Sequence, residues 1–403
     1  MSINRPSTIG TGDHIEVSPY TSARDAFGRS RVSQPYTNFD TKFLYDKLPL
    51  LWDESVTGGT STHDATNACV NLVVTTSGHS VIRQTKARFN YKSGKSQLYL
   101  FTGVIGTPTT NVIRRVGCFD ADNGLFFELN DSTLYVVVRK SGVDTKVAQS
   151  AWNVEKLNGT DWHGITLDMT KAQIFVIDFQ WLGVGDVRFG VFVDGECHYC
   201  HMSHTANTND SVYMSTPNLP IRYEITSTGG SATLKQICSS CISEGTLDKH
   251  MSSAESTPVF INANSTSERY AVLGIRLKST HLPATVYVDN LNVLTATNDS
   301  LRYTLSLNPT VSGTFTYNDI TNSYVQIAVS SGGNPSLEVL TNVGTKIQEG
   351  YVSNALRIAD IGIEELLFLG STISGVRDEL VLSVTPLAAN ADVYGSISWK
   401  ELI

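Results

Sequence analysis

The sequence predicts an all-β protein built from two β-sandwich domains. Hydrophobic residues make up 41% of the chain and charged residues only 17%, while serine, threonine, asparagine and glycine are abundant. This balance suits strands joined by many turns. Turn signals recur at the spacing of roughly 8 to 12 residues that is typical of sandwiches and jelly rolls. A length of 403 residues exceeds what one hydrophobic core usually spans, so we expect more than one domain.

The clearest single element is a hairpin over residues 173–195. Residues 173–181 alternate so that a strand there presents one aromatic face and one mixed face. A connection containing two glycines follows, and residues 187–193 place valine and phenylalanine on one face of a second strand. Asp194-Gly195 is a strong turn pair after it. We therefore expect this hairpin at the centre of the first sandwich.

Composition shifts divide the chain into four parts. Residues 1–40 carry many turn formers and mixed charges with little periodicity, which predicts an extended N-terminal arm. Residues 41–245 hold the first sandwich. Residues 246–267, rich in serine, threonine and glutamate, are expected to form a linker, and residues 268–403 the second sandwich.

Charge and hydropathy exclude several classes of protein. The net charge of −8 offers no field that would attract a phosphate backbone, so nucleic acid is not an expected partner. The chain has no run of apolar residues long enough to span a bilayer and no signal-peptide pattern, so we expect a soluble protein made in a cytoplasm, without membrane insertion. Six cysteines are too few for a disulfide scaffold and should be reduced there.

Two C-x-x-C pairs form the sharpest chemical pattern, namely Cys197 with Cys200 and Cys238 with Cys241. Paired spacing of this kind is typical of tetrahedral zinc. Both pairs fall in expected strands, where residues three apart point to opposite faces, and neither has the glycine of a zinc knuckle. We therefore prefer buried free thiols, which are common in protein cores, and keep zinc as the alternative.

No complete catalytic motif is present, so we expect no enzymatic activity and no cofactor. Asp120, Glu128 and Asp178 could in principle pair as the acids of a glycosidase. Ordinary surface or turn acids are the preferred interpretation, because the chain contains 38 acidic residues.

Three tryptophans could form a platform for sugar binding, because an aromatic face suits the apolar side of a pyranose. These are Trp152, Trp162 and Trp181. Packing in the core of the sandwich would explain the same residues and is the preferred interpretation.

Several segments resemble structural proteins of tailed phages, including phages of marine and cyanobacterial hosts. The resemblance spans much of the first 245 residues and is weaker over the second half. Its segments are residues 28–42 (GRSRVSQPYTNFDTK), residues 45–52, residues 178–190, residues 216–224 and residues 395–402. Residues 181–195 are also similar to concanavalin-like sandwiches, many of which bind glycans. The resemblance therefore implies a concanavalin-like or jelly-roll fold for the first sandwich.

The phage resemblance implies a virion structural protein, assembled in the host cytoplasm, that acts as a peripheral capsid or tail and baseplate component. Its partners would be other virion proteins and further copies of itself, with a trimer as the first expectation. The arm would tie the subunit to its neighbours. The expected contact residues are Arg29, Arg31, Tyr36, Phe39, Phe43 and Trp52. The alternative function is a carbohydrate-binding module that recognises a host receptor or another glycan, and then a glycan hydrolase. The position in the virion stays open between capsid, neck, tail, baseplate and fibre.

Overall fold

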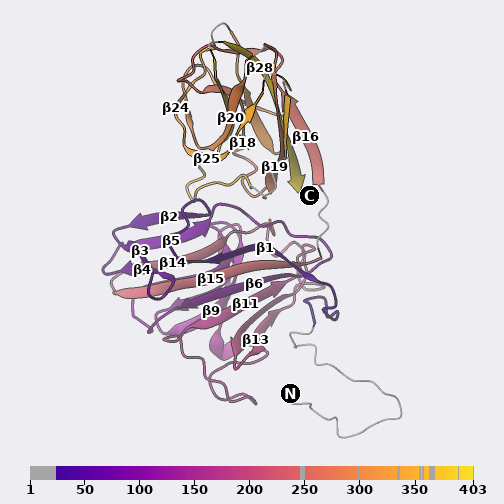
Figure 1. Ribbon diagram of the computed structural model, residues 1–403. Coiled ribbons are helices and arrows are strands. Elements are labelled where there is room, and N and C mark those ends of the chain that lie inside the picture. The colour runs from indigo at the N-terminus through magenta and orange to yellow at the C-terminus, as the bar shows by residue number, and fades with distance from the viewer. Residues whose placement is uncertain are drawn as a thin grey trace.

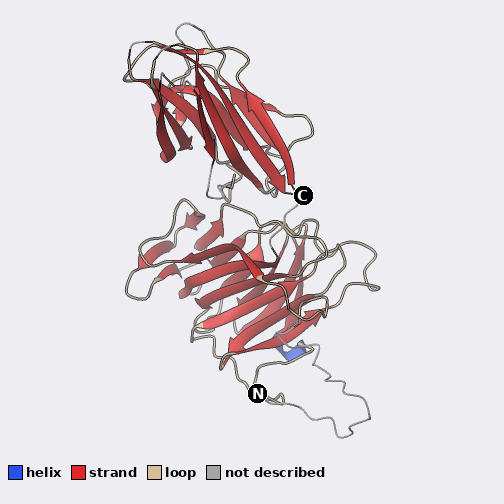
Figure 2. Ribbon diagram, turned by 45° about the vertical axis from the view of Figure 1, so that its right-hand side comes forward, coloured by secondary structure: helices blue, strands red, loops and turns tan. Residues whose placement is uncertain are grey.

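The computed structural model describes residues 24–245, 250–297, 299–333, 336–353, 355, 358–362, 368–388 and 390–402. It confirms the all-β class. The strands of the described residues form five antiparallel sheets, and their one short helix is the 3-10 turn η1 (Gln149–Ala151). Figure 2 shows strands running through both halves of the molecule. No helix in the described part is long and apolar enough to cross a membrane.

The first half of the chain is a sandwich of two sheets. The eight-stranded sheet has the order β13-β12-β11-β6-β15-β4-β3, and β1 also pairs with β15. Its strands are β1 (Pro35–Lys42), β3 (Thr60–Asp64), β4 (Cys69–Val74), β6 (Gln97–Val104), β11 (Gln173–Phe179), β12 (Val187–Val193), β13 (Glu196–Ser203) and β15 (Ala232–Glu244).

The seven-stranded sheet faces it, with the order β10-β9-β8-β7-β14-β5-β2. Its strands are β2 (Trp52–Thr57), β5 (Ser80–Thr85), β7 (Val112–Phe119), β8 (Gly124–Asn130), β9 (Thr133–Lys140), β10 (Val143–Ala148) and β14 (Ile221–Ser227).

The predicted hairpin forms in the first sandwich, but its strands are the second and third from one edge of the eight-stranded sheet and not at its centre. β11 and β12 pair antiparallel from Ile174 opposite Phe192 to Phe179 opposite Val187. After β12, Asp194 and Gly195 have φ of 52° and 82°, and positive φ at both central residues is what a type I′ turn requires. The chain then returns as β13, at the edge of the sheet.

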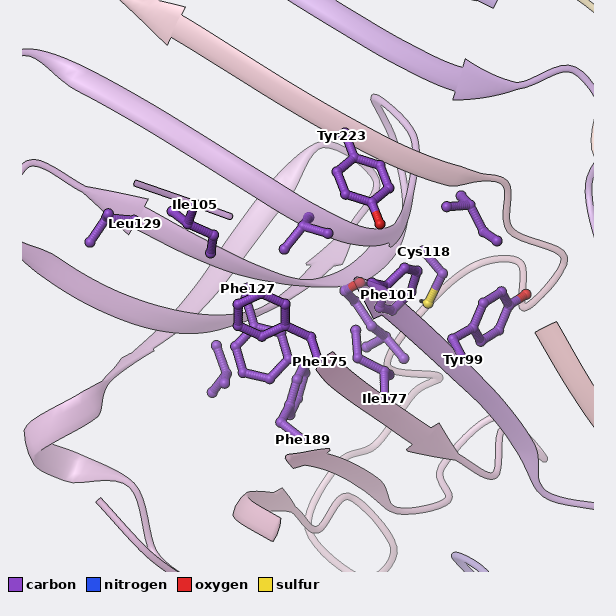
Figure 3. Packing of buried hydrophobic residues seen from close by; sticks show 14 of the residues in the cluster. Tyr99, Phe101, Ile105, Cys118, Phe127, Leu129, Phe175, Ile177, Phe189 and Tyr223 are labelled. Atoms are coloured by element: carbon purple, nitrogen blue, oxygen red, sulfur yellow. Dashed lines mark hydrogen bonds between the residues drawn. The ribbon is translucent and has the colours of Figure 1, made fainter. Parts of the chain in front are cut away.

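Aromatic rings from both sheets meet in the core of this sandwich (Figure 3). Phe127 of β8 contacts Phe175 of β11 and Phe189 of β12, with ring centroids 4.9 and 5.6 Å apart. All three side chains are completely buried. Burial of each such ring stabilises the fold by about 1.5–3 kcal/mol, which explains why β11 and β12 carry large apolar residues on their inner face.

The second half contains two larger sheets and one small one. The five-stranded sheet has the order β16-β28-β19-β26, with β17 also on β28, and the six-stranded sheet has the order β22-β23-β18-β27-β20-β25. The strands are β16 (His250–Ser256), β17 (Ile261–Ala263), β18 (Tyr270–Leu277), β19 (Val286–Thr295), β20 (Leu301–Leu307), β21 (Thr310–Val311), β22 (Tyr317–Asp319), β23 (Val325–Val329), β24 (Leu340–Asn342), β25 (Thr345–Val352), β26 (Ile358–Gly362), β27 (Leu380–Pro386) and β28 (Ala391–Leu402). The small sheet consists of β21 and β24.

The prediction of a linker over residues 246–267 is wrong for residues 250–256 and 261–263. Residues 250–256 form β16 and residues 261–263 form β17, and both pair with β28 of the second sandwich. Residues 246–249 lie outside the described residues. The segment was mistaken for a linker because β16 is an edge strand with an exposed, polar surface, which leaves no apolar periodicity in the sequence.

The two halves lie against each other, with their strands running in different directions (Figure 1). The backbone N–H of Ile373 donates a hydrogen bond of 2.7 Å to Asp53, and the hydroxyl of Thr285 donates one of 3.0 Å to the carbonyl of Arg88. Lys86 also approaches Asp378, with 3.8 Å between their charged groups. The contacts at this junction are therefore polar.

Candidate functional site

The described part of the predicted arm folds back onto its own sandwich. We call residues 24–31 the strap. Within it, Asp25 accepts hydrogen bonds from the backbone N–H groups of Phe27 and Arg29, so the segment forms a tight turn. The backbone N–H of Ala26 donates to the hydroxyl of Ser96 at 3.2 Å, which fixes the strap to the outer side of the eight-stranded sheet.

A fully buried carboxylate lies under the strap. Asp178 of β11 has no exposed surface and forms ion pairs with Arg31 of the strap and Arg188 of β12. The hydroxyl of Tyr199 donates to the same carboxylate at 3.0 Å, and so does the hydroxyl of Ser96. Arg31, which we predicted to contact another subunit, is therefore a partner of Asp178 within the chain.

Two of the other predicted assembly contacts are buried inside the chain itself, whereas Arg29 is 53% exposed and its contact with another subunit stays a prediction. Phe43 and Trp52 are 0% and 2% exposed and lie in the core of the first sandwich, so the prediction that they contact another subunit is wrong. Phe39 packs against that core. Arg29 pairs with Asp25 of the strap.

Tyr36 lies on β1, which pairs with β15. The ammonium group of Lys92 lies 5.0 Å from the centre of its ring. Residues 35–42 of the predicted arm and its continuation are therefore a strand of the first sandwich itself.

The outer side of the seven-stranded sheet carries an ion-pair network. Arg115 donates to Glu128 at 2.7 Å and to Glu224 at 2.6 Å. Lys146 also binds Glu128, and Arg222 also binds Glu224. Burial alone would raise the pKa of Glu224, but the guanidinium groups of Arg222 and Arg115 outweigh it and lower that pKa below its ordinary value.

The three acids proposed as a glycosidase pair are not brought together. Asp178 lies on the outer side of one sheet and Glu128 on the outer side of the opposite sheet. Asp120 pairs with Arg88, and this charge lowers the pKa of Asp120 against the raising effect of its burial. Each of these carboxylates forms an ion pair with an arginine side chain. The acid of a glycosidase needs a raised pKa and an accessible proton instead.

The two C-x-x-C pairs lie on two different strands of one sheet. Cys197 and Cys200 belong to β13, and Cys238 and Cys241 to β15. Three strands separate β13 from β15, which corresponds to about 19 Å at the usual strand spacing. The two pairs therefore cannot share one zinc ion, and all six cysteines of the chain are free.

The three tryptophans do not form one platform. Trp152 is 3% exposed and lies in the core, where its indole N–H donates to the carbonyl of Val147. Trp181 packs against the same core and donates to the carbonyl of Met214. The core interpretation is correct for both. Trp162, in contrast, is 71% exposed.

Trp162 lies in a loop, residues 153–168, that we call the tryptophan loop. The loop begins along the free edge of β13, where the backbone N–H groups of Val154 and Glu155 both donate to the carbonyl of Cys200 at 3.1 Å. The side-chain amide of Asn153 both donates to and accepts from the backbone of Met202. These bonds anchor the loop to the sheet.

Internal hydrogen bonds then hold the tip of the tryptophan loop. The backbone N–H of Gly159 donates to the carbonyl of Ile165 at 2.8 Å, and that of Leu167 donates to Leu157 at 2.9 Å. The side chain of Asn158 accepts from the backbone and the hydroxyl of Thr160. Asn158-Gly159 is a turn signal that sequence reasoning could have used. The tip thus presents the indole of Trp162 to solvent from an ordered turn.

Sequence reasoning also missed a cavity in the second sandwich. It has a volume of about 360 Å³ and is lined by Phe315, Tyr317, Arg276 and Glu379, among others. Arg276 donates to Glu379 at 2.6 Å, and its guanidinium lies 4.0 Å from the centre of the Tyr317 ring. Burial and the nearby Glu379 raise the pKa of Tyr317 above its ordinary value. Residues from three strands and two loops build this cavity, so no local motif marks it.

No family model matches the chain, and no curated protein matches it either. Solved structures similar to it cover about half of its length. A legume lectin-like domain from Entamoeba histolytica is 14% identical over 50% of this chain and 95% of its own, with a TM-score of 0.31. A lectin from Bauhinia forficata in complex with GalNAc is 12% identical over 52% of this chain and 99% of its own, with a TM-score of 0.32.

A putative β-glucanase from Mycobacterium abscessus is 11% identical over 51% of this chain and 100% of its own, with a TM-score of 0.35. Each of these matches covers about half of this chain and nearly all of the solved structure.

Proposed function

We propose that the chain is a glycan-binding protein without enzymatic activity, and that the tryptophan loop is its contact with sugar. The observation that carries this proposal is the 71% exposure of Trp162 on an anchored loop. A large apolar ring held in water at the tip of an ordered turn is suited to cover the apolar face of a pyranose.

Polar groups beside Trp162 supply the second requirement of a sugar site. Asn158 and Thr160 are exposed, and Asp161 is half-buried one residue before the indole. Amide, hydroxyl and carboxylate groups next to an aromatic ring orient a sugar through its hydroxyls. The loop therefore combines a stacking surface with hydrogen-bonding groups.

The state of the acids supports binding without hydrolysis. Glu128, Glu224 and Asp178 are each held by arginine or lysine. Cleavage of a glycosidic bond needs one protonated acid and a second carboxylate on opposite sides of the bond. Carboxylates that are locked into ion pairs are poorly suited to that role.

A glycan array with the purified full chain tests this proposal, followed by titration calorimetry on each hit. Trp162→Ala should weaken binding about tenfold, which is about 1.4 kcal/mol, because it removes the stacking surface. Val143→Ala is the matched control, since Val143 is a 70% exposed apolar residue of the same sandwich outside the loop. Equal affinity of the Trp162 variant and the parent protein for every hit would refute this site.

An exposed apolar segment favours a second candidate function, assembly into the virion of a tailed phage. Leu44, Tyr45, Leu50 and Leu51 are 45%, 91%, 50% and 44% exposed and follow one another between β1 and β2. Clusters of exposed apolar side chains are typical of protein interfaces. In this proposal the segment contacts another copy of the chain, with a trimer expected, or another virion protein in a peripheral capsid, tail or baseplate position.

Light scattering of the full chain at several concentrations tests assembly. The double variant Leu44→Ser/Tyr45→Ser should shift the protein towards the monomer, while Leu182→Ser, an exposed apolar change in another loop, should not. A monomeric parent protein at all concentrations would refute self-assembly through this segment. Truncation at Asp40 is unsuitable as a test, because it removes most of β1 from the sheet.

A further inference from the structure

Three side chains with metal-binding atoms converge behind Trp162. Glu155 lies at the anchored start of the tryptophan loop, His163 at its tip and His198 on β13. One ligand atom from each residue, two imidazole nitrogens and a carboxylate oxygen, lies within 4.8 Å of the other two. The loop therefore brings together residues that are far apart in the sequence.

The carboxylate of Glu155 provides an independent observation. Glu155 is 4% exposed, and one of its oxygens pairs with His163. The other oxygen, Oε2, is buried and has no hydrogen-bond partner, and it lies 3.5 Å from Nδ1 of His198. A buried acceptor without a partner is unfavourable by about 1–3 kcal/mol, and more when it is charged. A cation between Glu155 and the two imidazoles would remove this penalty.

We propose that Glu155, His163 and His198 bind a divalent transition-metal ion, for which zinc is the best match. Two histidines and one glutamate form a ligand set found in zinc sites with three protein ligands. Metal–ligand bonds of about 2.0–2.2 Å in a tetrahedral site place the ligand atoms about 3.3–3.6 Å from one another. The three ligand atoms here lie within 4.8 Å of one another, so a small inward movement of the side chains would bring them to this distance. His163 can make this movement because its side chain is 31% exposed at the loop tip.

The ligand types also set the selectivity of the site. Calcium and magnesium prefer six or more oxygen ligands, whereas imidazole favours zinc and its neighbours in the first transition row. Three protein ligands leave a fourth position for water or for an oxygen of a bound molecule. Trp162 supplies none of the proposed ligands, but its indole packs against His163, with ring centroids 3.4 Å apart, so the proposed metal site and the proposed glycan site adjoin at the loop tip.

The test uses the full chain after treatment with EDTA and gel filtration into metal-free buffer. Calorimetric titration with ZnCl₂ should show binding of one ion per chain, and titration with CaCl₂ should show none. Glu155→Gln and His198→Gln should weaken zinc binding by more than the roughly 100-fold that loss of an outer-shell partner costs. His281→Gln is the matched control, because His281 stacks on Tyr324 in the second sandwich.

Two further measurements keep the proposal open to refutation if a buried variant misfolds. His163→Gln changes a partly exposed residue at the loop tip and should fold normally, yet it should weaken zinc binding. Co²⁺ bound to the parent protein should give the visible absorption of a tetrahedral site. Absence of zinc binding, or equal binding by the parent and His163→Gln, would show that the cluster is only a hydrogen-bonded chain. If Trp162→Ala still binds zinc, the metal site does not need the indole that the proposed glycan site uses.

Discussion

The variant Asp178→Asn tests whether the strap is held by a buried charge. The substitution keeps the shape of the side chain but removes the anionic partner of Arg188 and leaves Arg31 with only the more distant carboxylate of Glu244, at 3.9 Å. Arg188 is 1% exposed, so its charge cannot be solvated without movement of the sheet. Removal of one member of a buried ion pair destabilises a protein by about 3–5 kcal/mol. For a unit of this size that loss lowers the melting temperature by about 6–20 °C.

Urea unfolding at 25 °C, followed by tryptophan fluorescence, measures the loss, and calorimetry gives the melting temperature. Limited trypsin digestion should also cleave the variant faster after Arg29 and Arg31, because the strap is released. Asp289→Asn is the control, since the pair between Asp289 and Lys400 is partly exposed and should contribute at most about 1 kcal/mol. If Asp178→Asn changes the free energy of unfolding by less than about 1 kcal/mol, the strap is held by something other than this carboxylate.

Three further predictions concern other parts of the chain. The pKa of Glu224 is lowered in the folded protein, so its ion pairs stabilise the fold above the unfolded pKa of about 4.3. This stabilisation is lost as the pH falls through the folded pKa. Glu224→Gln should therefore be less stable than the parent protein at pH 7, and urea unfolding curves should show this difference shrinking below about pH 4. Cys197 is half-buried, and desolvation, with the nearby charge of Asp178, raises its pKa to about 12. At pH 8 its thiol should therefore react with Ellman's reagent far more slowly than in urea, and rapid reaction in the native state would contradict the raised pKa. Gly195→Ala should destabilise the protein by about 1 kcal/mol through its positive φ alone, because a methyl group there meets no neighbour, and an unchanged melting temperature would argue against the type I′ turn.

The fold was predictable where one face of a strand is apolar and the other is not. Residues 173–193 show this alternation, and β11 and β12 form there as expected. β16 was missed because an exposed edge strand leaves no such signal. An alternation of apolar and polar residues along a strand indicates which face packs against the opposite sheet. A strand that buries few side chains shows no such alternation, so this signal does not detect it.

The sites were less predictable, because they depend on contacts between distant residues. Arg31 and Asp178 are 147 positions apart, and nothing local to either indicates that they pair. The tryptophans pose a different problem, since Trp152 and Trp162 lie in similar polar surroundings in the sequence. Trp152 directly follows η1 and is buried in the core, whereas Trp162 is exposed, and only the path of the chain decides between them.

The pairing of β1 with β15 sets the order in which the first sandwich can be completed during synthesis. The two strands are separated by roughly 190 residues, so at about 5–20 residues per second the ribosome needs about 10–40 s to deliver β15 after β1. Throughout that interval the nascent chain carries an unpaired strand, together with the exposed side chains of Phe39 and Phe43. Completion of the core waits for residues 232–244, so the emerging polypeptide is most in need of chaperone protection over most of the translation of its first half.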